Sequence, residues 1–363
     1  MSRQSSASAS AKMPAPGDAK TIGDDGSSVA SVTSSVANSF PPLSGKHSST
    51  PTSSRQNTVS NNLASHVPAA NQWKFWSPAR LAYRVQVKLK KCAQSDTGCY
   101  IFVFGVPANL VERIEDTFEH YEIRKQLRLT YEHALESLLI KCTVGIPHES
   151  ISWTFIFKIA QKICQLPEHN EYCYRLTGTA TFSVVGERSK QADGGLSPVA
   201  TRNGLTDWPS VLIEVGDSQH LKDLRRDASW WLDHSGGRTR MVFIIKLNKD
   251  PMSLRLECWQ MIDDESQPST ESRKPKVPGF NEYWEIDAAG EVTHLKDHPD
   301  IVILYLTVFD VDHEHGMPLI ISKNDLKLWA LHIFQDITAA EHVCPQSSTS
   351  DIIIDMFTLL TKL

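Results

Sequence analysis

The chain has 363 residues, of which 40% are hydrophobic and 22% are charged, so it is long enough for one large or two ordinary domains. These proportions exclude collagen-like and coiled-coil proteins. The longest apolar runs, 101–106 and 301–309, are shorter than the roughly 20 residues of a membrane-spanning helix, so we expect no membrane partner. The formal net charge of −5 argues against a protein that coats polyanions with its whole surface.

Composition divides the chain into five predicted parts. Residues 1–70 are rich in Ser, Ala, Thr, Asn and Pro, and they predict a disordered tail because they bury too little apolar area. A mostly helical N-terminal lobe is expected over 71–145 and an α/β core over 146–262. A loop over 263–280 and a strand-and-helix extension over 281–363 complete the prediction.

Local patterns predict elements on both sides of the core. In the N-terminal lobe, β-branched and aromatic residues over 82–91 and 100–106 predict strands. The apolar spacing over 110–141 predicts helix. In the C-terminal extension we expect a strand over 301–309 and a helix over 322–337, opened by a polar cap.

The core is predicted to have the element order αβββαββ, in one mixed β-sheet flanked by helices. Apolar residues four apart over 150–166 predict the first helix. Nearly unbroken apolar runs over 211–213 and 241–245 predict central strands covered on both faces. Alternation over 253–259 predicts an edge strand.

Seven scattered cysteines, without Cys-x-x-Cys spacing, argue against a disulfide framework or a zinc ribbon. The N-terminal Met-Ser-Arg-Gln lacks the apolar segment of a secretory signal. We therefore expect an intracellular protein, nuclear or cytoplasmic; its oligomeric state is not indicated. The sequence also lacks the nucleophile-elbow, Walker, zincin and Rossmann motifs, so no small-molecule cofactor is expected.

Two acidic residues of the core are candidates for a metal site. Glu214 interrupts an apolar strand, where an ionised carboxylate is costly unless a cation, a metal or hydrogen bonds satisfy it. Asp193 ends the preceding extended segment, so the two carboxylates could share one Mg²⁺. Two alternatives stay open: Asp193 with its following glycines forms a turn, and Glu214 pairs with Arg225 or Arg226.

The succession of Asp193, Glu214 and a following helix resembles the PD-(D/E)XK nuclease superfamily. The local sequence resembles a set of uncharacterised fungal nuclease-like proteins. The resemblance is carried by Trp208-Pro-Ser-Val-Leu-Ile-Glu-Val-Gly216, Leu224-Arg-Arg-Asp-Ala228, Trp231-Leu232 and Ser235-Gly-Gly237. The resemblance covers roughly 146–259, with a weaker similarity to about residue 331, and implies a restriction-endonuclease-like αβββαβ core. It also implies that Asp193, Glu214 and the carbonyl of Val215 bind Mg²⁺ or Mn²⁺.

Two positions depart from the superfamily pattern. Ala192 stands where a proline is expected before the aspartate, and Gly216 stands where the water-activating lysine is expected. The resemblance therefore requires a basic residue from another element, and the candidates are Lys190, Lys222, Arg225 and Lys246.

Two functions follow as hypotheses. The first is a metal-dependent nuclease that hydrolyses DNA or RNA, with Asp193 and Glu214 on the metal and Lys190 or Lys246 positioning the water. The basic helix face formed by Lys222, Arg225 and Arg226 would contact phosphates. The second is a catalytically inactive nuclease-like fold that serves as a nucleic-acid-binding or protein-interaction module.

Overall fold

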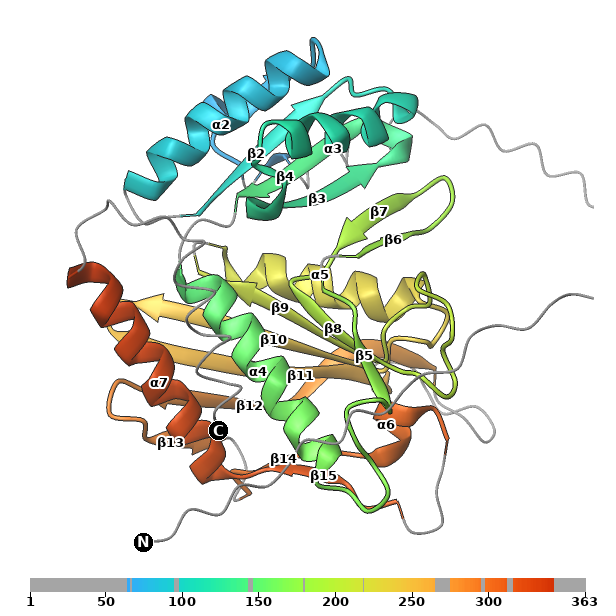
Figure 1. Ribbon diagram of the computed structural model, residues 1–363, viewed down its shortest axis with the longest axis vertical. Helices are drawn as coiled ribbons and strands as arrows, with labels where there is room; N and C mark the ends of the chain where they lie inside the picture. The colour runs from blue at the N-terminus through green and yellow to red at the C-terminus, as the bar shows by residue number, and fades with distance from the viewer. Residues whose placement is uncertain are drawn as a thin grey trace, which may run out of the picture. The chain divides into compact units, whose positions relative to one another are not determined.

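The computed structural model describes residues 64–65, 67–94, 98–142, 146–178, 180–217, 219–264, 275–294, 298–311 and 316–342. Most of the predicted tail and residues 265–274 of the predicted loop lie outside these ranges. The described part is a mixed α/β structure with sheets of six, seven and two strands (Figure 1). None of its helices has the length and apolar character needed to cross a membrane.

The six-stranded sheet contains most of the N-terminal lobe, in the order β1-β2-β4-β3-β7-β6. Its strands are β1 (Gln72–Lys74), β2 (Cys99–Phe104), β3 (Leu127–Glu132), β4 (Ser137–Cys142), β6 (Thr181–Ser183) and β7 (Arg188–Gln191). Helices α2 (Pro78–Gln94) and α3 (Val111–His120) pack on this sheet and share one hydrophobic core with it (Figure 1).

The prediction of a mostly helical N-terminal lobe is wrong in two places. Residues 82–91 are part of α2 rather than a strand, because the buried Leu81, Val85 and Leu89 recur every four residues along one helix face. Residues 110–141 contain α3 but also β3 and β4, in which apolar and polar residues alternate between the sheet faces. The strand predicted over 100–106 is confirmed as β2.

The seven-stranded sheet has the order β13-β12-β11-β10-β9-β8-β5. Only β9 and β10 are parallel; the other neighbours are antiparallel. Its strands are β5 (Tyr174–Leu176), β8 (Gly194–Pro198), β9 (Val211–Gly216), β10 (Met241–Lys249), β11 (Met252–Asp263), β12 (Lys276–Asp287) and β13 (Val292–His294). Contrary to the prediction, β11 is not an edge strand, since it pairs with both β10 and β12.

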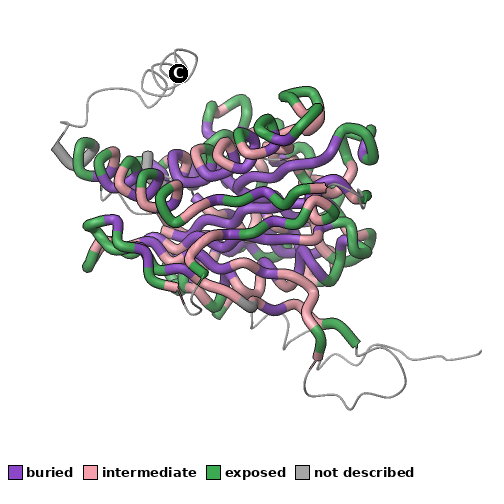
Figure 2. The backbone as a smooth tube through the Cα atoms, turned by 90° about the horizontal axis from the view of Figure 1, so that it is seen from below, coloured by how far each residue is buried: buried purple, intermediate pink, exposed green. Residues whose placement is uncertain are grey.

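Helices cover both faces of this sheet, as the sequence predicts for its apolar central strands. Phe243 and Ile245 of β10 share a core with α4 (Ile146–Cys164) and α7 (Lys323–His342). Val242 and Ile244 face the other way and pack with α5 (Leu221–His234). Because both faces are covered, β9 is buried along its whole length and β10 is buried over residues 241–245. Figure 2 shows this buried interior of the sheet.

The C-terminal extension differs from the prediction over 301–309. These residues form the short strand β14 (Ile301–Ile303), paired with β15 (Leu319–Ile321), and then helix α6 (Tyr305–Phe309). The predicted helix over 322–337 is confirmed as α7. Ser322 Oγ accepts from the backbone N–H of Asp325, and the Asp325 carboxylate accepts from the N–H of Ser322, so the two residues form a capping box.

The packing of α7 provides a matched test of this fold. Ile333 is fully buried against the seven-stranded sheet, whereas Leu328 on the same helix is 59% exposed. We expect Ile333→Ala to lower the free energy of unfolding by about 2–5 kcal/mol, because it removes buried methyl groups and leaves a cavity. Leu328→Ala should change it by less than about 0.5 kcal/mol. Equal losses for the two variants in denaturant titrations would contradict the assigned packing.

Candidate functional site

Asp193 and Val215 meet where the pairing of β8 with β9 stops. The last paired residues are Gly194 and Ile213, so the N–H and carbonyl of Val215 have no strand partner on this side. Asp193 Oδ2 accepts from the Val215 N–H at 2.9 Å. The ammonium of Lys141, from β4, donates to the Val215 carbonyl at 2.7 Å and to Asp193 Oδ2 at 2.6 Å. One lysine thus links the two sheets through a buried carboxylate.

Two more cationic side chains surround Asp193. Arg128 lies directly opposite Lys141 in the β3–β4 register, and its Nε lies 3.6 Å from Asp193 Oδ1. His148 in the first turn of α4 places Nε2 3.3 Å from Oδ2. Like charges opposite each other on two strands repel. Asp193 offsets this repulsion because its carboxylate lies within ion-pair distance of both strands.

Glu214 has its own cationic partner. Lys190 of β7 donates to Glu214 Oε1 at 2.5 Å, and the indole N–H of Trp231 on α5 donates to the same oxygen at 2.6 Å. The Lys190 ammonium also lies 3.6 Å from Asp227 Oδ2. The alternative that pairs Glu214 with Arg225 or Arg226 is therefore wrong. Of the cation, metal or hydrogen bonds expected to satisfy this carboxylate, the structure shows the cation Lys190 and a hydrogen bond from Trp231.

The pKa values of the two carboxyl groups are shifted in opposite directions. Burial favours a higher pKa for Asp193, but Lys141 and then His148 outweigh burial and hold that pKa well below its ordinary value. Burial raises the pKa of Glu214; Lys190 opposes this rise, while the charge of Asp193 adds to it. Burial favours a lower pKa for Lys190, but Asp227 and Glu214 outweigh it and raise the pKa. Both acids and Lys190 thus belong to one electrostatic cluster.

Each acid of this cluster has a basic partner. Glu149 accepts from Arg128 at 2.9 Å and adds a fourth acid. The basic residues are Arg128, Lys141, His148 and Lys190, and the acidic residues are Glu149, Asp193, Glu214 and Asp227. Burial opposes protonation of His148, but Asp193 outweighs burial and raises its pKa. Removing one partner of such a buried pair leaves the other charge uncompensated.

The residues as they lie do not fit a resident divalent cation. Mg²⁺ prefers carboxylate and carbonyl oxygens. Asp193 Oδ2 and the Val215 carbonyl already accept from the Lys141 ammonium, and Glu214 Oε1 accepts from Lys190. A dication at that place would lie against a fixed positive charge. In the described part of the chain, no three His, Cys, Asp or Glu side chains are grouped to hold a metal ion.

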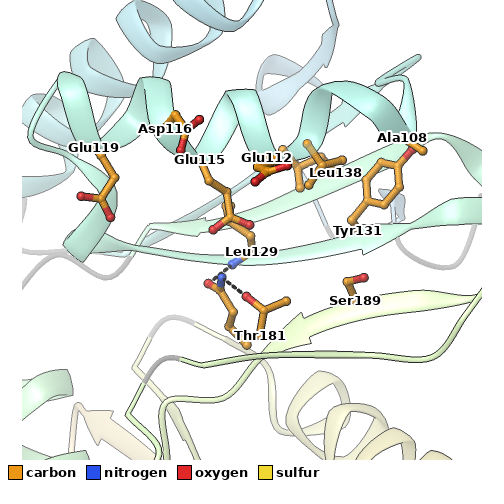
Figure 3. A pocket seen from close by; sticks show the side chains of 12 residues that line it. Ala108, Glu112, Glu115, Asp116, Glu119, Leu129, Tyr131, Leu138, Thr181 and Ser189 are labelled. Atoms are coloured by element: carbon orange, nitrogen blue, oxygen red, sulfur yellow. Dashed lines mark hydrogen bonds between the residues drawn. The ribbon is translucent and has the colours of Figure 1, made fainter. Parts of the chain in front are cut away.

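Space at the site is also small. The cavity that touches Asp193 and Gly194 has a volume of about 10 Å³, at the lower limit for one water molecule. A larger groove of about 520 Å³ lies elsewhere, between α3 and strands β3 and β7 (Figure 3). It is lined by Glu112, Glu115, Asp116 and Glu119 on the helix side, so its charge does not suit a phosphate (Figure 3).

The other candidate residues are not brought to the two acids. Lys246 donates to the carbonyls of Asp217 and Leu247, and burial lowers its pKa. Arg225 makes two hydrogen bonds to the buried Glu257, Arg226 pairs with Asp223 at 3.3 Å, and Lys222 is exposed on α5. The predicted basic face of α5 is therefore largely neutralised by its own ion pairs.

Gly216 has a packing reason to lack a side chain. A Cβ at this position would lie 2.6 Å from Leu224 Cδ1, and Leu224 is fully buried in the core under α5. A lysine here would have to displace that leucine, which costs about 1–3 kcal/mol as overpacking. The position two residues after Glu214 is thus closed to the expected lysine.

Sequence reasoning missed Arg128, Lys141 and His148. The first two interrupt the apolar strands Leu-Arg-Leu-Thr-Tyr-Glu and Ser-Leu-Leu-Ile-Lys-Cys, which is the same signal that identified Glu214. The apolar spacing over 110–141 predicts helix, and a helical prediction does not show which side chains share a sheet face. The pairing between distant strands that brings these cations to Asp193 is not present in any local pattern.

Comparison with known proteins adds no relative: no protein-family model matches the chain, and no curated protein matches it. The resemblance to PD-(D/E)XK nucleases thus remains a prediction from the residues themselves.

The Asp193–Lys141 pair gives a test of the cluster. Asp193→Asn leaves buried cations without their anion, so we expect the free energy of unfolding to fall by about 3–5 kcal/mol, and Lys141→Met should cost a similar amount. The double variant should lose clearly less than the sum, because neither unpaired charge remains. Denaturant titrations at pH 7 measure the free energy of unfolding of the wild type, the two single variants and the double variant. Strictly additive losses would contradict the pairing.

The same series has a defined pH dependence. Because the folded-state pKa of Asp193 is depressed, its stabilisation is full above about pH 4 and is lost as the pH falls through that depressed pKa. The stability difference between the wild type and Asp193→Asn should therefore shrink as the pH falls below about 4 and through that depressed pKa.

Proposed function

We propose that this chain is a catalytically inactive nuclease-like protein that serves as a nucleic-acid-binding module. The succession α4, β8, β9, α5 and β10 supports a restriction-endonuclease-like core, with Asp193 and Glu214 at the positions that the resemblance assigns to them. One departure is that β7, which carries Lys190, pairs within the six-stranded sheet.

The observation that carries the proposal is the position of the Lys141 ammonium. It binds the Asp193 carboxylate and the Val215 carbonyl, the same two groups that the resemblance assigns to the metal. Lys190 meanwhile neutralises Glu214 rather than facing an open cavity. The acids therefore stabilise the contact between the two sheets, and phosphodiester hydrolysis is not part of this proposal.

A specific observation also favours a second candidate, a Mg²⁺- or Mn²⁺-dependent nuclease. Asp193 Oδ1 is buried without a hydrogen-bond partner, which is unusual for a carboxylate oxygen and leaves it available as a ligand. In this candidate Lys141 leaves its place, and Asp193, Glu214 and the Val215 carbonyl hold the metal. Lys190 would be the basic residue beside them.

A cleavage and binding assay on the full chain separates the two candidates. We expect the wild-type protein to bind fluorescent DNA or RNA oligonucleotides in EDTA, as measured by anisotropy. With millimolar Mg²⁺ or Mn²⁺ present, it should leave plasmid, single-stranded DNA and RNA intact, because the Lys141 ammonium already binds the Asp193 carboxylate and the Val215 carbonyl.

Two matched variants control for contaminating nucleases. Asp193→Asn and Glu214→Gln, purified in the same way, should give the same absence of cleavage as the wild type. Metal-dependent cleavage by the wild type that both variants abolish would overturn the first candidate and establish the second. Failure of the wild type to bind any nucleic acid would contradict the binding function.

A further inference from the structure

Helix α2 carries an unusual concentration of positive charge. Its 17 residues include no acid and five cationic residues, in a chain whose net charge is −5: Arg80, Arg84, Lys88, Lys90 and Lys91. Such a local excess is not explained by the composition of the whole chain. It needs either nearby acids or a partner outside the chain.

The geometry of the helix places these charges outward. The buried residues of α2 all lie on the side that packs on the six-stranded sheet, and they are Leu81, Ala82, Val85, Leu89 and Cys92. At about 100° per residue, Arg80, Arg84 and Lys88 lie within about 80° of one another, along one border of that buried side. Residues four apart are about 6 Å apart along the axis, so the three cations form one continuous stripe.

These cations differ from those of α5 in their partners. Arg225 and Arg226 are neutralised by Glu257 and Asp223. Among the residues that the structure describes, Arg84 and Lys88 form no ion pair with a carboxylate. The stripe on α2 thus keeps its charge available for an anionic partner.

Aromatic side chains accompany the stripe. Trp76, just before the helix, is 66% exposed and Tyr83 is 60% exposed. Arg80 lies over the Trp76 ring at 5.1 Å, and Arg84 lies over the ring of Trp73 at 4.0 Å. Tyr83, Arg84 and Lys88 also line a groove of about 410 Å³. Two large exposed rings thus lie beside a row of cations, a combination that suits a partner with both negative charge and flat apolar faces.

We propose that this face of α2, with Trp76, binds single-stranded nucleic acid. The cation stripe follows the phosphates, and unpaired bases stack on Trp76 and Tyr83. A double helix hides its base faces, and an acidic peptide has no flat rings to stack, so a single strand uses both features of the surface. This inference rests on the proposed binding function and assigns it a surface, but it does not depend on whether the Asp193 cluster is catalytic.

Anisotropy titrations of the full chain with labelled single-stranded oligonucleotides test the surface. We expect Arg84→Glu/Lys88→Glu to weaken binding at least ten-fold and to reduce the salt dependence by the equivalent of about two phosphate contacts. Tyr83→Ala should weaken binding about five-fold or more with an unchanged salt dependence, because stacking is not ionic. All three positions are partly or fully exposed, so circular dichroism should show that the variants remain folded.

A matched control has the same change in net charge elsewhere. Lys276→Glu/Lys323→Glu reverses two exposed lysines, one at the start of β12 and one at the start of α7, and should leave binding within about two-fold. A loss as large as that of the α2 variant would overturn the assigned surface. Equal affinities for duplex and single-stranded oligonucleotides would also overturn it. So would a result in which polyglutamate competes as effectively as an unlabelled oligonucleotide at the same ionic strength.

Two failures can be told apart. If the wild type binds nucleic acid and the α2 variants bind equally well, this inference is wrong and the proposed binding function stands. If the wild type binds no nucleic acid, the proposed function itself is wrong.

Discussion

The buried carboxylate of Asp193 is the constraint on which the rest of the described structure depends. An ionised group at this depth is tolerated only with cationic partners, and they come from strands β3 and β4 and from the start of α4. The six-stranded and seven-stranded sheets are therefore joined through a charge as well as through β7 and β8, which follow each other in the chain. Lys141 is central because it satisfies Asp193 and an otherwise unpaired backbone carbonyl with one ammonium. Removing either ion leaves the other buried and uncompensated, so both are needed for the contact.

This constraint has a chemical consequence. A catalytic metal centre needs an excess of negative ligands and an open coordination position. The cluster around Asp193 and Glu214 instead pairs each acid with a basic side chain, has a cavity of about 10 Å³, and has a glycine at position 216, where a side chain would meet Leu224. Shifted pKa values by themselves do not distinguish a catalytic site from a structural ion-pair network, because both shift pKa values. The pairing favours a structural role for the two acids, and the positive charge of α2 favours a binding role at another surface.

Much of the core could be predicted from the sequence, because its signals are local. Unbroken apolar runs predicted the two central strands, four-residue spacing predicted α4, and Glu214 was recognised as a buried acid in need of a cation. The predictions failed where the outcome depends on pairing between distant segments. The 82–91 segment reads as β-branched and aromatic, yet its apolar residues complete a helix face; β11 alternates like an edge strand, yet β12 covers it. The alternative that pairs Glu214 with Arg225 or Arg226 failed for the same reason, since Lys190 reaches Glu214 from a strand of the other sheet.

The most direct test of the account follows the Asp193 carboxylate itself. In protein labelled with ¹³C at the aspartate side-chain carboxyl, the signal absent from Asp193→Asn identifies this residue. We expect it to remain at the ionised position as the pH falls through the ordinary titration range of an aspartate, and to be unmoved by millimolar Mg²⁺ at pH 7. A signal that titrates near pH 4 and shifts with Mg²⁺ would contradict the ion pair with Lys141 and restore a metal to the site.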